Sequence, residues 1–188
     1  MARAPRCELA GELFHVTARG SARLKIFTDD RDRWRYLWLL ARTTRRVGWS
    51  CLSYCLMGNH IHLLIEAEVV DLSRGMHRLQ GAYASAFNRR HGGSGHVFED
   101  RFNSQPVTSE LHLLATVRYI ANNPVAAGLC DDPAAWPWSS HGALLRGETP
   151  SWLDVPRLYA YLAVYGGDPR RRYAELLNGA RHPLSWRA

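Results

Sequence analysis

Two histidines separated by a single residue, His60 and His62, lie within the otherwise apolar segment 56–65. Side chains alternate faces along a β-strand, so we expect both imidazoles on one face and Ile61 on the other. Two imidazoles on one face of a rigid strand supply half of a divalent metal site. A polar strand face that binds nothing has the same pattern, so a metal site also requires ligands from another element.

Tyr119 and Asn123 are the second pair of residues that could do chemistry. They lie at the end of a helix predicted over 110–122, which Ser109 caps and Pro124 closes. The apolar stripe of this helix consists of Leu113, Leu114, Val117, Ile120 and Ala121. Tyr119 and Asn123 are one turn apart on nearly the opposite side, so the stripe does not explain them.

Together these four residues suggest phosphoryl-transfer chemistry. An imidazole pair and one amide oxygen can hold a divalent cation and leave positions open for a phosphate oxygen. Such a cation polarises the phosphate and neutralises the charge that develops on it. A tyrosine one helical turn from a ligand is then placed to attack phosphorus covalently. A surface tyrosine at a second interface is the alternative interpretation of Tyr119.

The elements that must position these residues alternate through the first 125 positions. In chain order the pattern predicts a strand over 13–18, a helix from Thr28 or Asp29 to Gly48 and a hairpin over 49–67. A helix from Asp71 to about Asn88, an irregular strand over 98–107 and the helix over 110–122 follow. Gly58-Asn59 is the expected hairpin turn, because both residues tolerate positive φ. The first helix is expected to bury Trp34, Leu37, Trp38 and Ala41. This order favours an α+β, ferredoxin-like fold, with an antiparallel sheet of four or five strands and helices packed on it.

The composition favours a nucleic-acid partner. The formal net charge is +7, and all of the 24 basic residues except Lys25 are arginine, alongside seven tryptophans and eight tyrosines. Arginine binds phosphate in a bidentate manner and stacks on bases. A genome whose base composition favours arginine codons would give the same enrichment, so the charge alone does not establish a nucleic-acid partner.

The cysteines and the absence of long apolar runs argue against a zinc-knuckle protein, a membrane protein and a secreted protein. Cys7, Cys51, Cys55 and Cys130 form no Cys-x-x-Cys pair, which argues against a zinc knuckle. Cys51 and Cys55 are expected to be small buried residues of a strand. No segment has the length of a membrane span or the pattern of a signal peptide. We therefore expect an intracellular protein with no membrane partner.

Five sequence blocks resemble one known family. His60-Ile61-His62, preceded by Met57-Gly58-Asn59, resembles the His-hydrophobe-His motif of the single-tyrosine HUH transposases, and 118–129 resembles their tyrosine helix. The other blocks are 15–20, 95–102 and 136–140, and the order and spacing of all five are most similar to the REP-associated tyrosine transposases. The family often has proline where this chain has Gly58, which changes the turn and leaves the ligands in place.

The resemblance implies a ferredoxin-like domain over 1–145 that cuts and rejoins single-stranded DNA through a 5′-phosphotyrosine link. By position, His60, His62 and Asn123 would be metal ligands and Tyr119 the nucleophile. The metal would be Mg²⁺ or Mn²⁺, which the amide oxygen also favours. The partner would be single-stranded or hairpin DNA, with the protein a monomer or a homodimer in the cytoplasm at the nucleoid. A helical extension over 146–188, basic and aromatic, lies outside the resemblance.

Seven basic residues are candidates for contacts to DNA: Arg19, Arg23, Lys25, Arg89, Arg90, Arg101 and Arg118. Two other functions remain open at this stage. One is a relative that grips hairpin DNA without cutting it. The other is a metal-dependent hydrolase of a small molecule, which would lack the usual nearby carboxylate base.

Overall fold

Two central strands, β1 (Glu12–Arg19) and β3 (His60–Ala67), form the middle of the sheet in the computed structural model. The structure describes residues 12–164 and 166–178, and Cys7 lies outside these ranges. β1 and β3 pair in antiparallel fashion from Glu12 opposite Ala67 to Arg19 opposite His60. β2 (Ser50–Leu56) pairs with the other side of β3, and β4 (Asn103–Pro106) with the other side of β1.

The strand order among the described residues is β2-β3-β1-β4, with every pair antiparallel. Helix α1 (Asp30–Val47) follows β1, and α2 (Val69–His91) follows β3. This order of elements and strands is ferredoxin-like, and the predicted α+β class with a four-stranded sheet is confirmed.

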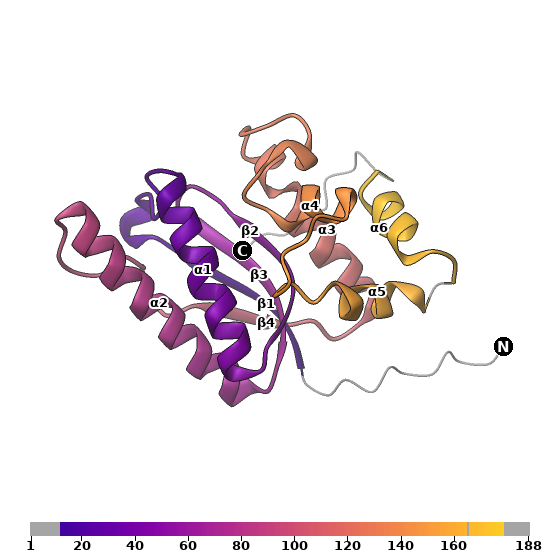
Figure 1. Ribbon diagram of the computed structural model, residues 1–188, viewed down its shortest axis with the longest axis horizontal. Helices are drawn as coiled ribbons and strands as arrows, with labels where there is room; N and C mark the ends of the chain where they lie inside the picture. The colour runs from indigo at the N-terminus through magenta and orange to yellow at the C-terminus, as the bar shows by residue number, and fades with distance from the viewer. Residues whose placement is uncertain (1–11, 165, 179–188) are drawn as a thin grey trace.

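The helices cover both faces of the sheet. Figure 1 shows α1 and α2 side by side on one face, whereas α3 (Glu110–Ala126) and the C-terminal helices lie on the other. The C-terminal helices are α4 (Ser140–Arg146), α5 (Val155–Ala163) and α6 (Pro169–Asn178). None of the described helices is both long and apolar enough to cross a bilayer.

The β2–β3 hairpin turns at Gly58-Asn59 as predicted, with the amide of Met57 donating to the carbonyl of His60 at 2.9 Å. Neither turn residue adopts the positive φ on which that prediction rested. The turn is instead held from outside. The Gly58 carbonyl accepts the amides of Ile26 and Phe27 at 3.1 and 3.2 Å.

Helix α1 is rotated relative to the prediction. Asp29 caps it and Gly48 ends it in the left-handed conformation, as expected. Of the four residues predicted to be buried, Leu37 is buried and Ala41 is half-buried, whereas Trp34 and Trp38 are 64% and 46% exposed. The other members of the buried face are Tyr36, Leu39, Leu40, Thr43 and Thr44. The sequence offers two apolar faces, and packing selects this one because Tyr36 meets Tyr83 of α2 at a ring-centroid distance of 5.1 Å.

Two predicted helix boundaries were wrong. Asp71 lies within the first turn of α2, and the N-cap position is Glu68. Helix α3 continues through Pro124 to Ala126, because the ring of this proline is buried and the following turn is closed by backbone bonds such as Ala127 to Asn123 at 3.0 Å. The irregular strand predicted over 98–107 is confirmed: it is regular only in β4, at an edge of the sheet, and is preceded by an isolated bridge between Gly20 and Phe98.

The C-terminal helices share the core of the sheet. Arg157 of α5 forms two 2.8 Å hydrogen bonds to the buried Glu66 of β3, and the Tyr161 hydroxyl donates to the same carboxylate at 3.0 Å. Leu158 and Leu162 are buried in the same hydrophobic cluster. A boundary at residue 145 stays a prediction.

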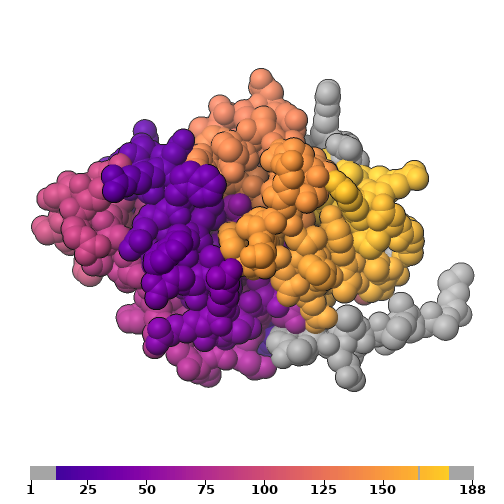
Figure 2. Space-filling model, viewed as in Figure 1, coloured from indigo at the N-terminus to yellow at the C-terminus, as the bar shows by residue number. Residues whose placement is uncertain are grey.

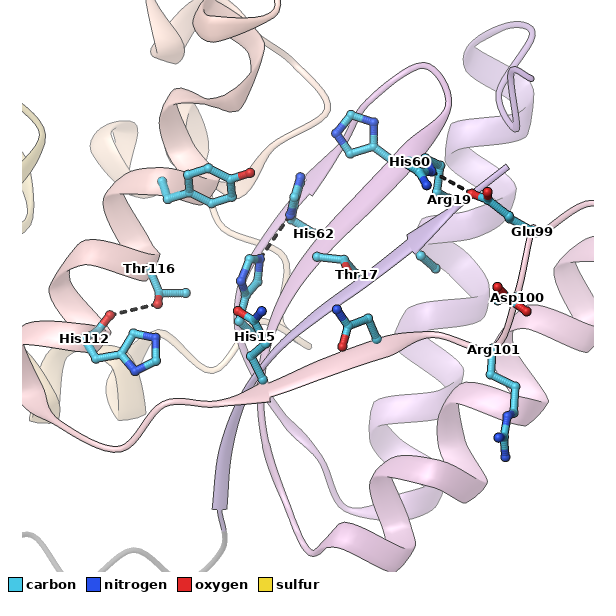
Figure 3. Close-up of a pocket in the computed structure, with 14 residues that line it drawn as sticks. His15, Thr17, Arg19, His60, His62, Glu99, Asp100, Arg101, His112 and Thr116 are labelled. Atoms are coloured by element: carbon cyan, nitrogen blue, oxygen red, sulfur yellow. Dashed lines mark hydrogen bonds and ion pairs between the residues drawn. The ribbon is translucent and has the colours of Figure 1, made fainter. Parts of the chain in front are cut away.

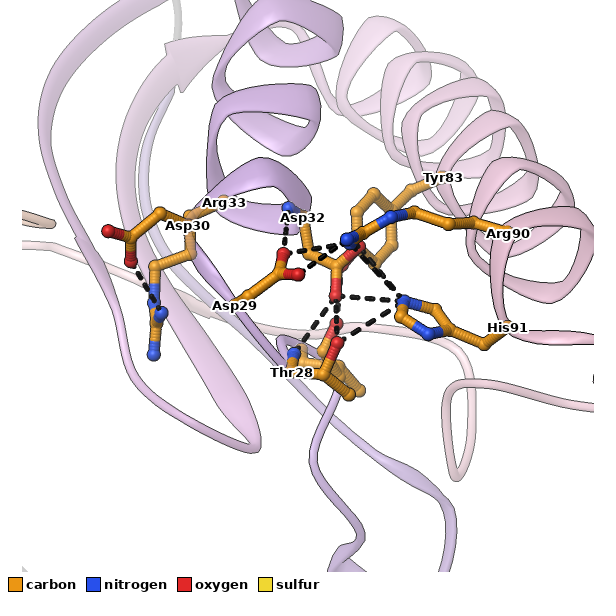
Figure 4. Close-up of polar contacts among 9 residues, drawn as sticks. Thr28, Asp29, Asp30, Asp32, Arg33, Tyr83, Arg90 and His91 are labelled. Carbon is orange, nitrogen blue, oxygen red and sulfur yellow. Dashed lines mark hydrogen bonds and ion pairs between the residues drawn. The ribbon is translucent and has the colours of Figure 1, made fainter.

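A polar cluster ties the start of α1 to the end of α2 (Figure 4). Asp32 is 3% exposed and accepts hydrogen bonds from the amide and hydroxyl of Thr28 at 2.9 and 2.6 Å. Arg90 forms ion pairs with Asp29 and Asp32, and His91 lies 3.1 Å from Asp32. Burial alone would raise the pKa of Asp32, but the bonds from Thr28, His91 and Arg90 hold it below its ordinary value.

Candidate active site

His60 and His62 lie on the same face of β3, as the two-residue alternation predicts. Their ring centroids are 5.0 Å apart, and the rings are nearly perpendicular. On the neighbouring strand β1, Arg19 is opposite His60 and Thr17 is opposite His62. The face of the two central strands that lies towards α3 is therefore polar at this end.

Helix α3 brings Tyr119 to the same face. The Tyr119 ring lies edge-on to His62 at 5.4 Å and to His15 at 5.7 Å between centroids, and the residue is 40% exposed. Asn123 follows one turn later and donates its amide N–H to the Tyr119 carbonyl at 3.1 Å. This bond leaves the Asn123 amide oxygen as the group available for the imidazoles or for a cation.

The buried imidazoles are held in the neutral form. Burial lowers the pKa of His62 well below its ordinary value, and His15 and His60 lower it further. Burial also lowers the pKa of His60, and it brings the pKa of His15 to about 4 with a contribution from His112. The nearby Asn123 side chain acts in the opposite direction on His60 and His62. Neutral imidazole is the form that binds metal ions.

Neighbouring side chains orient the two ligand candidates. Asn59 donates its amide N–H to the Arg23 carbonyl at 3.0 Å, so its oxygen faces Nδ1 of His60 at 2.7 Å. Since that oxygen only accepts, Nδ1 of His60 carries the proton and Nε2 keeps its lone pair. Nδ1 of His62 lies 3.0 Å from Nε2 of His15.

The Nε2 atom of His62 is buried and has no hydrogen-bond partner among the described residues. A buried polar atom without a partner is costly, and a bound cation would satisfy it. The residues present therefore fit a divalent metal, with Nε2 of His60, Nε2 of His62 and the amide oxygen of Asn123 as ligands. Over the described ranges no cluster of three or more His, Cys, Asp and Glu side chains is suited to a metal, so the amide is needed to complete the set.

His60, His62 and Tyr119 line a cavity of about 570 Å³. Figure 3 shows His15 and His62 side by side on the central strands, facing α3, which carries His112 and Thr116. Arg19, Glu99 and Arg101 lie at the end of the cavity away from α3 (Figure 3). Arg19 donates to Glu99 at 2.7 Å, and Asp100 also lines the cavity, so this rim carries both acidic and basic groups.

The seven basic candidates are not gathered in one place. Arg19 and Arg101 line the cavity, and the other five do not. Arg23, Lys25 and Arg89 are exposed. Arg90 is engaged in the ion pairs with Asp29 and Asp32, so its first role is to join α1 to α2.

Several residues that line the cavity were not singled out from the sequence as functional, above all His15, His112 and Thr116. A signal for His15 was present: it alternates with Thr17 and Arg19 on a predicted strand, as His60 does with His62. His112 and Thr116 precede Tyr119 on α3 by seven and three residues, a spacing that returns to the same side of a helix.

The fold and cavity thus define a ferredoxin-like protein with a histidine–tyrosine site on the sheet face opposite its first two helices. The sequence model of the family described as "Transposase IS200 like" matches residues 11–123, more than half of the chain, and the protein belongs to this family. No curated protein matches the chain.

Two solved structures are similar. One is described as "Structure of the REP associates tyrosine transposase bound to a REP hairpin", with a TM-score of 0.62, 19% identity and coverage of 80% of this chain and 89% of that chain. The other is a candidate transposase from Deinococcus radiodurans R1, with a TM-score of 0.44, 17% identity and coverage of 65% of this chain and 97% of that chain. At these identities the first similarity supports the fold alone.

Proposed function

We propose that this transposase nicks and rejoins single-stranded DNA with Tyr119 as the nucleophile. The observation that carries the proposal is the placement of Tyr119, which lies edge-on to His62 in an open cavity within one turn of Asn123. The Tyr119 oxygen attacks a backbone phosphorus and loses its proton, and the bond from phosphorus to the 3′ oxygen breaks. The 3′ oxygen takes up a proton, so a 5′-phosphotyrosine and a free 3′-hydroxyl result. Rejoining is the reverse, with a 3′-hydroxyl as the attacking group.

His60, His62 and Asn123 would hold Mg²⁺ or Mn²⁺. When bound, such a cation polarises the phosphate and neutralises the charge that develops on its oxygens. Asn59 orients His60 through its Nδ1 proton, and His15 would do the same for His62 by accepting a proton from its Nδ1. Both Nε2 lone pairs would then be available before any ligand arrives.

The cavity rim would orient the strand. Arg19 and Arg101 bind backbone phosphates, whereas Glu99 and Asp100 repel them, so a DNA strand crosses the rim by a restricted path. Arg23, Lys25, Arg89 and Arg118 remain proposed contacts outside the cavity. Binding should weaken with salt, because each phosphate contact releases counterions.

The substrate we propose is a DNA hairpin with single-stranded flanks, of the kind named in the description of the similar solved structure. The protein would act on it in the cytoplasm at the nucleoid, as a monomer or a homodimer.

The test uses labelled hairpin DNA from repeats that flank the gene, incubated with the full chain and Mg²⁺ or Mn²⁺. We expect a nicked strand and a covalent protein–DNA product that survives denaturing electrophoresis. Tight hairpin binding with neither product would overturn the proposal and favour a relative that grips DNA without cutting it.

A further inference from the structure

The outer side of α1 carries an unusual concentration of arginine. At about 100° per residue, one sector of this helix contains six residues that we call the α1 arginine face: Arg31, Arg35, Trp38, Arg42, Arg45 and Arg46. All six are exposed. The acidic residues of the helix lie outside the sector, since Asp32 is buried and Asp30 pairs with Arg33 at its start.

Two guanidinium groups of this face stack on an exposed tryptophan. Those of Arg35 and Arg42 lie 4.6 and 4.7 Å from the Trp38 ring centroid. Stacking of this kind leaves the N–H groups at the edge of each guanidinium available for phosphate oxygens. Within the described part of the chain, none of the five arginines forms a salt bridge.

Five such charges on one rigid surface repel one another and favour a polyanion. Arg31 and Arg46 are about 22 Å apart along the helix axis at 1.5 Å per residue. A DNA duplex carries one phosphate charge per about 1.7 Å of its axis, so a straight basic surface of this length matches a straight duplex better than a flexible single strand. Apart from Trp38 the face has no apolar residue that would suit a membrane or a protein core.

This face is separate from the cavity of Tyr119. It lies on the opposite side of the sheet, and α1 is turned towards the viewer in Figures 1 and 2. The segment that leads into α1 contacts the β2–β3 turn next to His60, through the amides of Ile26 and Phe27. The arginine face therefore begins at the end of the sheet where the cavity opens.

We propose that the α1 arginine face binds the backbone of a double-stranded DNA stem, while the cavity holds the adjoining single strand. The role of the single strand rests on the proposed function; binding of the stem does not. Because the two contact surfaces lie on opposite sides of the sheet, the junction between the stem and the single-stranded flank would lie at the end of the sheet near His60.

The test compares two triple variants that lower the net charge equally. One is Arg35→Gln, Arg42→Gln and Arg46→Gln on the arginine face. The matched control is Arg74→Gln, Arg78→Gln and Arg171→Gln, which are exposed arginines of α2 and α6. The probe is a blunt DNA hairpin without single-stranded flanks, and its affinity is measured from 50 to 200 mM KCl.

Each phosphate contact contributes about 0.9 to the steepness of the plot of log affinity against log salt concentration. The α1 triple variant removes three such contacts, so we expect its slope to be shallower by about 2.7. Wild-type protein should then lose about 40-fold more affinity over this salt range than the variant does. The control should keep the wild-type slope. An unchanged slope in the α1 variant, or an equal decrease in the control, would overturn the proposal; circular dichroism verifies that each variant is folded.

A separate assay distinguishes the two proposals. A hairpin with single-stranded flanks, incubated with Mn²⁺ at a saturating protein concentration, tests nicking separately from stem affinity. If it is never nicked but the slope changes as expected, the duplex surface stands and the proposed nuclease fails. If it is nicked and the slope does not change, the nuclease stands and the duplex surface fails.

Discussion

Nε2 of His15 lies 3.0 Å from Nδ1 of His62, so one proton joins the imidazoles of two neighbouring strands. Which nitrogen carries that proton decides what His62 can bind. With the proton on Nδ1 of His62, its buried Nε2 keeps a lone pair for a metal. The contact makes His15 a positioning residue for His62, in the way that outer partners commonly orient metal-binding histidines.

The first prediction follows from this contact. His15→Leu should weaken Mn²⁺ binding by about 10- to 100-fold, because His62 loses the acceptor that fixes its proton. His15→Gln retains an oxygen acceptor and should recover part of the affinity. Mn²⁺ binding is measured by electron paramagnetic resonance without DNA, and ¹⁵N chemical shifts report the His62 tautomer. Equal Mn²⁺ affinity in wild type and His15→Leu would refute the role.

The second prediction concerns the nucleophile. Tyr119→Phe removes only a hydroxyl from a partly exposed ring, so fold and hairpin binding should be kept while nicking falls by at least about 10⁴-fold. Tyr159→Phe on α5 is the control and should nick normally. Covalent product formed by Tyr119→Phe at the wild-type rate would rule out this tyrosine.

The third prediction separates catalysis from folding. The proposed ligands are two imidazoles and an amide without thiolate, a set that gives modest affinity and not a structural metal site. EDTA should therefore abolish nicking and leave the melting temperature nearly unchanged. His62→Ala should also abolish nicking while hairpin binding is largely kept. A large fall in melting temperature with EDTA would show that the metal is structural.

The fourth prediction concerns the cluster that joins α1 to α2. Asp32→Asn should lower the free energy of unfolding by about 2–3 kcal/mol near pH 7, because Arg90 loses a buried charged partner. Asp30→Asn is the control, since its side chain is 73% exposed, and should change stability by less than about 0.5 kcal/mol.

The same cluster predicts that the free energy of unfolding depends on pH in the acid range. The pKa of Asp32 is lower in the folded protein than in the unfolded chain, so its stabilisation is fully present above about pH 4. It is lost as the pH falls through the folded-state pKa. Urea unfolding of wild type and Asp32→Asn should therefore converge at low pH. A constant difference between pH 7 and pH 2.5 would contradict the assignment.

The sequence alone determined the features that depend on local periodicity. The two-residue repeat of a strand places His60 and His62 on one face, and the turn of a helix places Tyr119 beside Asn123. The order of strands and helices was sufficient for the ferredoxin-like class, because few topologies satisfy it. Helix ends with a side-chain cap or a left-handed glycine, such as Asp29 and Gly48, were also correctly placed.

The partners that lie opposite these residues depend on tertiary packing. The register of β1 on β3 brings His15 to His62 across 47 positions of chain, and no local pattern encodes that pairing. Packing against α2 chose which apolar side of α1 is buried and left Trp38 at the surface between two arginines. The sequence predicted that Arg90 contacts DNA, whereas the fold places the carboxylates of Asp29 and Asp32 beside it. Periodicity fixes the direction of a side chain relative to its own backbone, whereas its partners depend on how distant segments pack together.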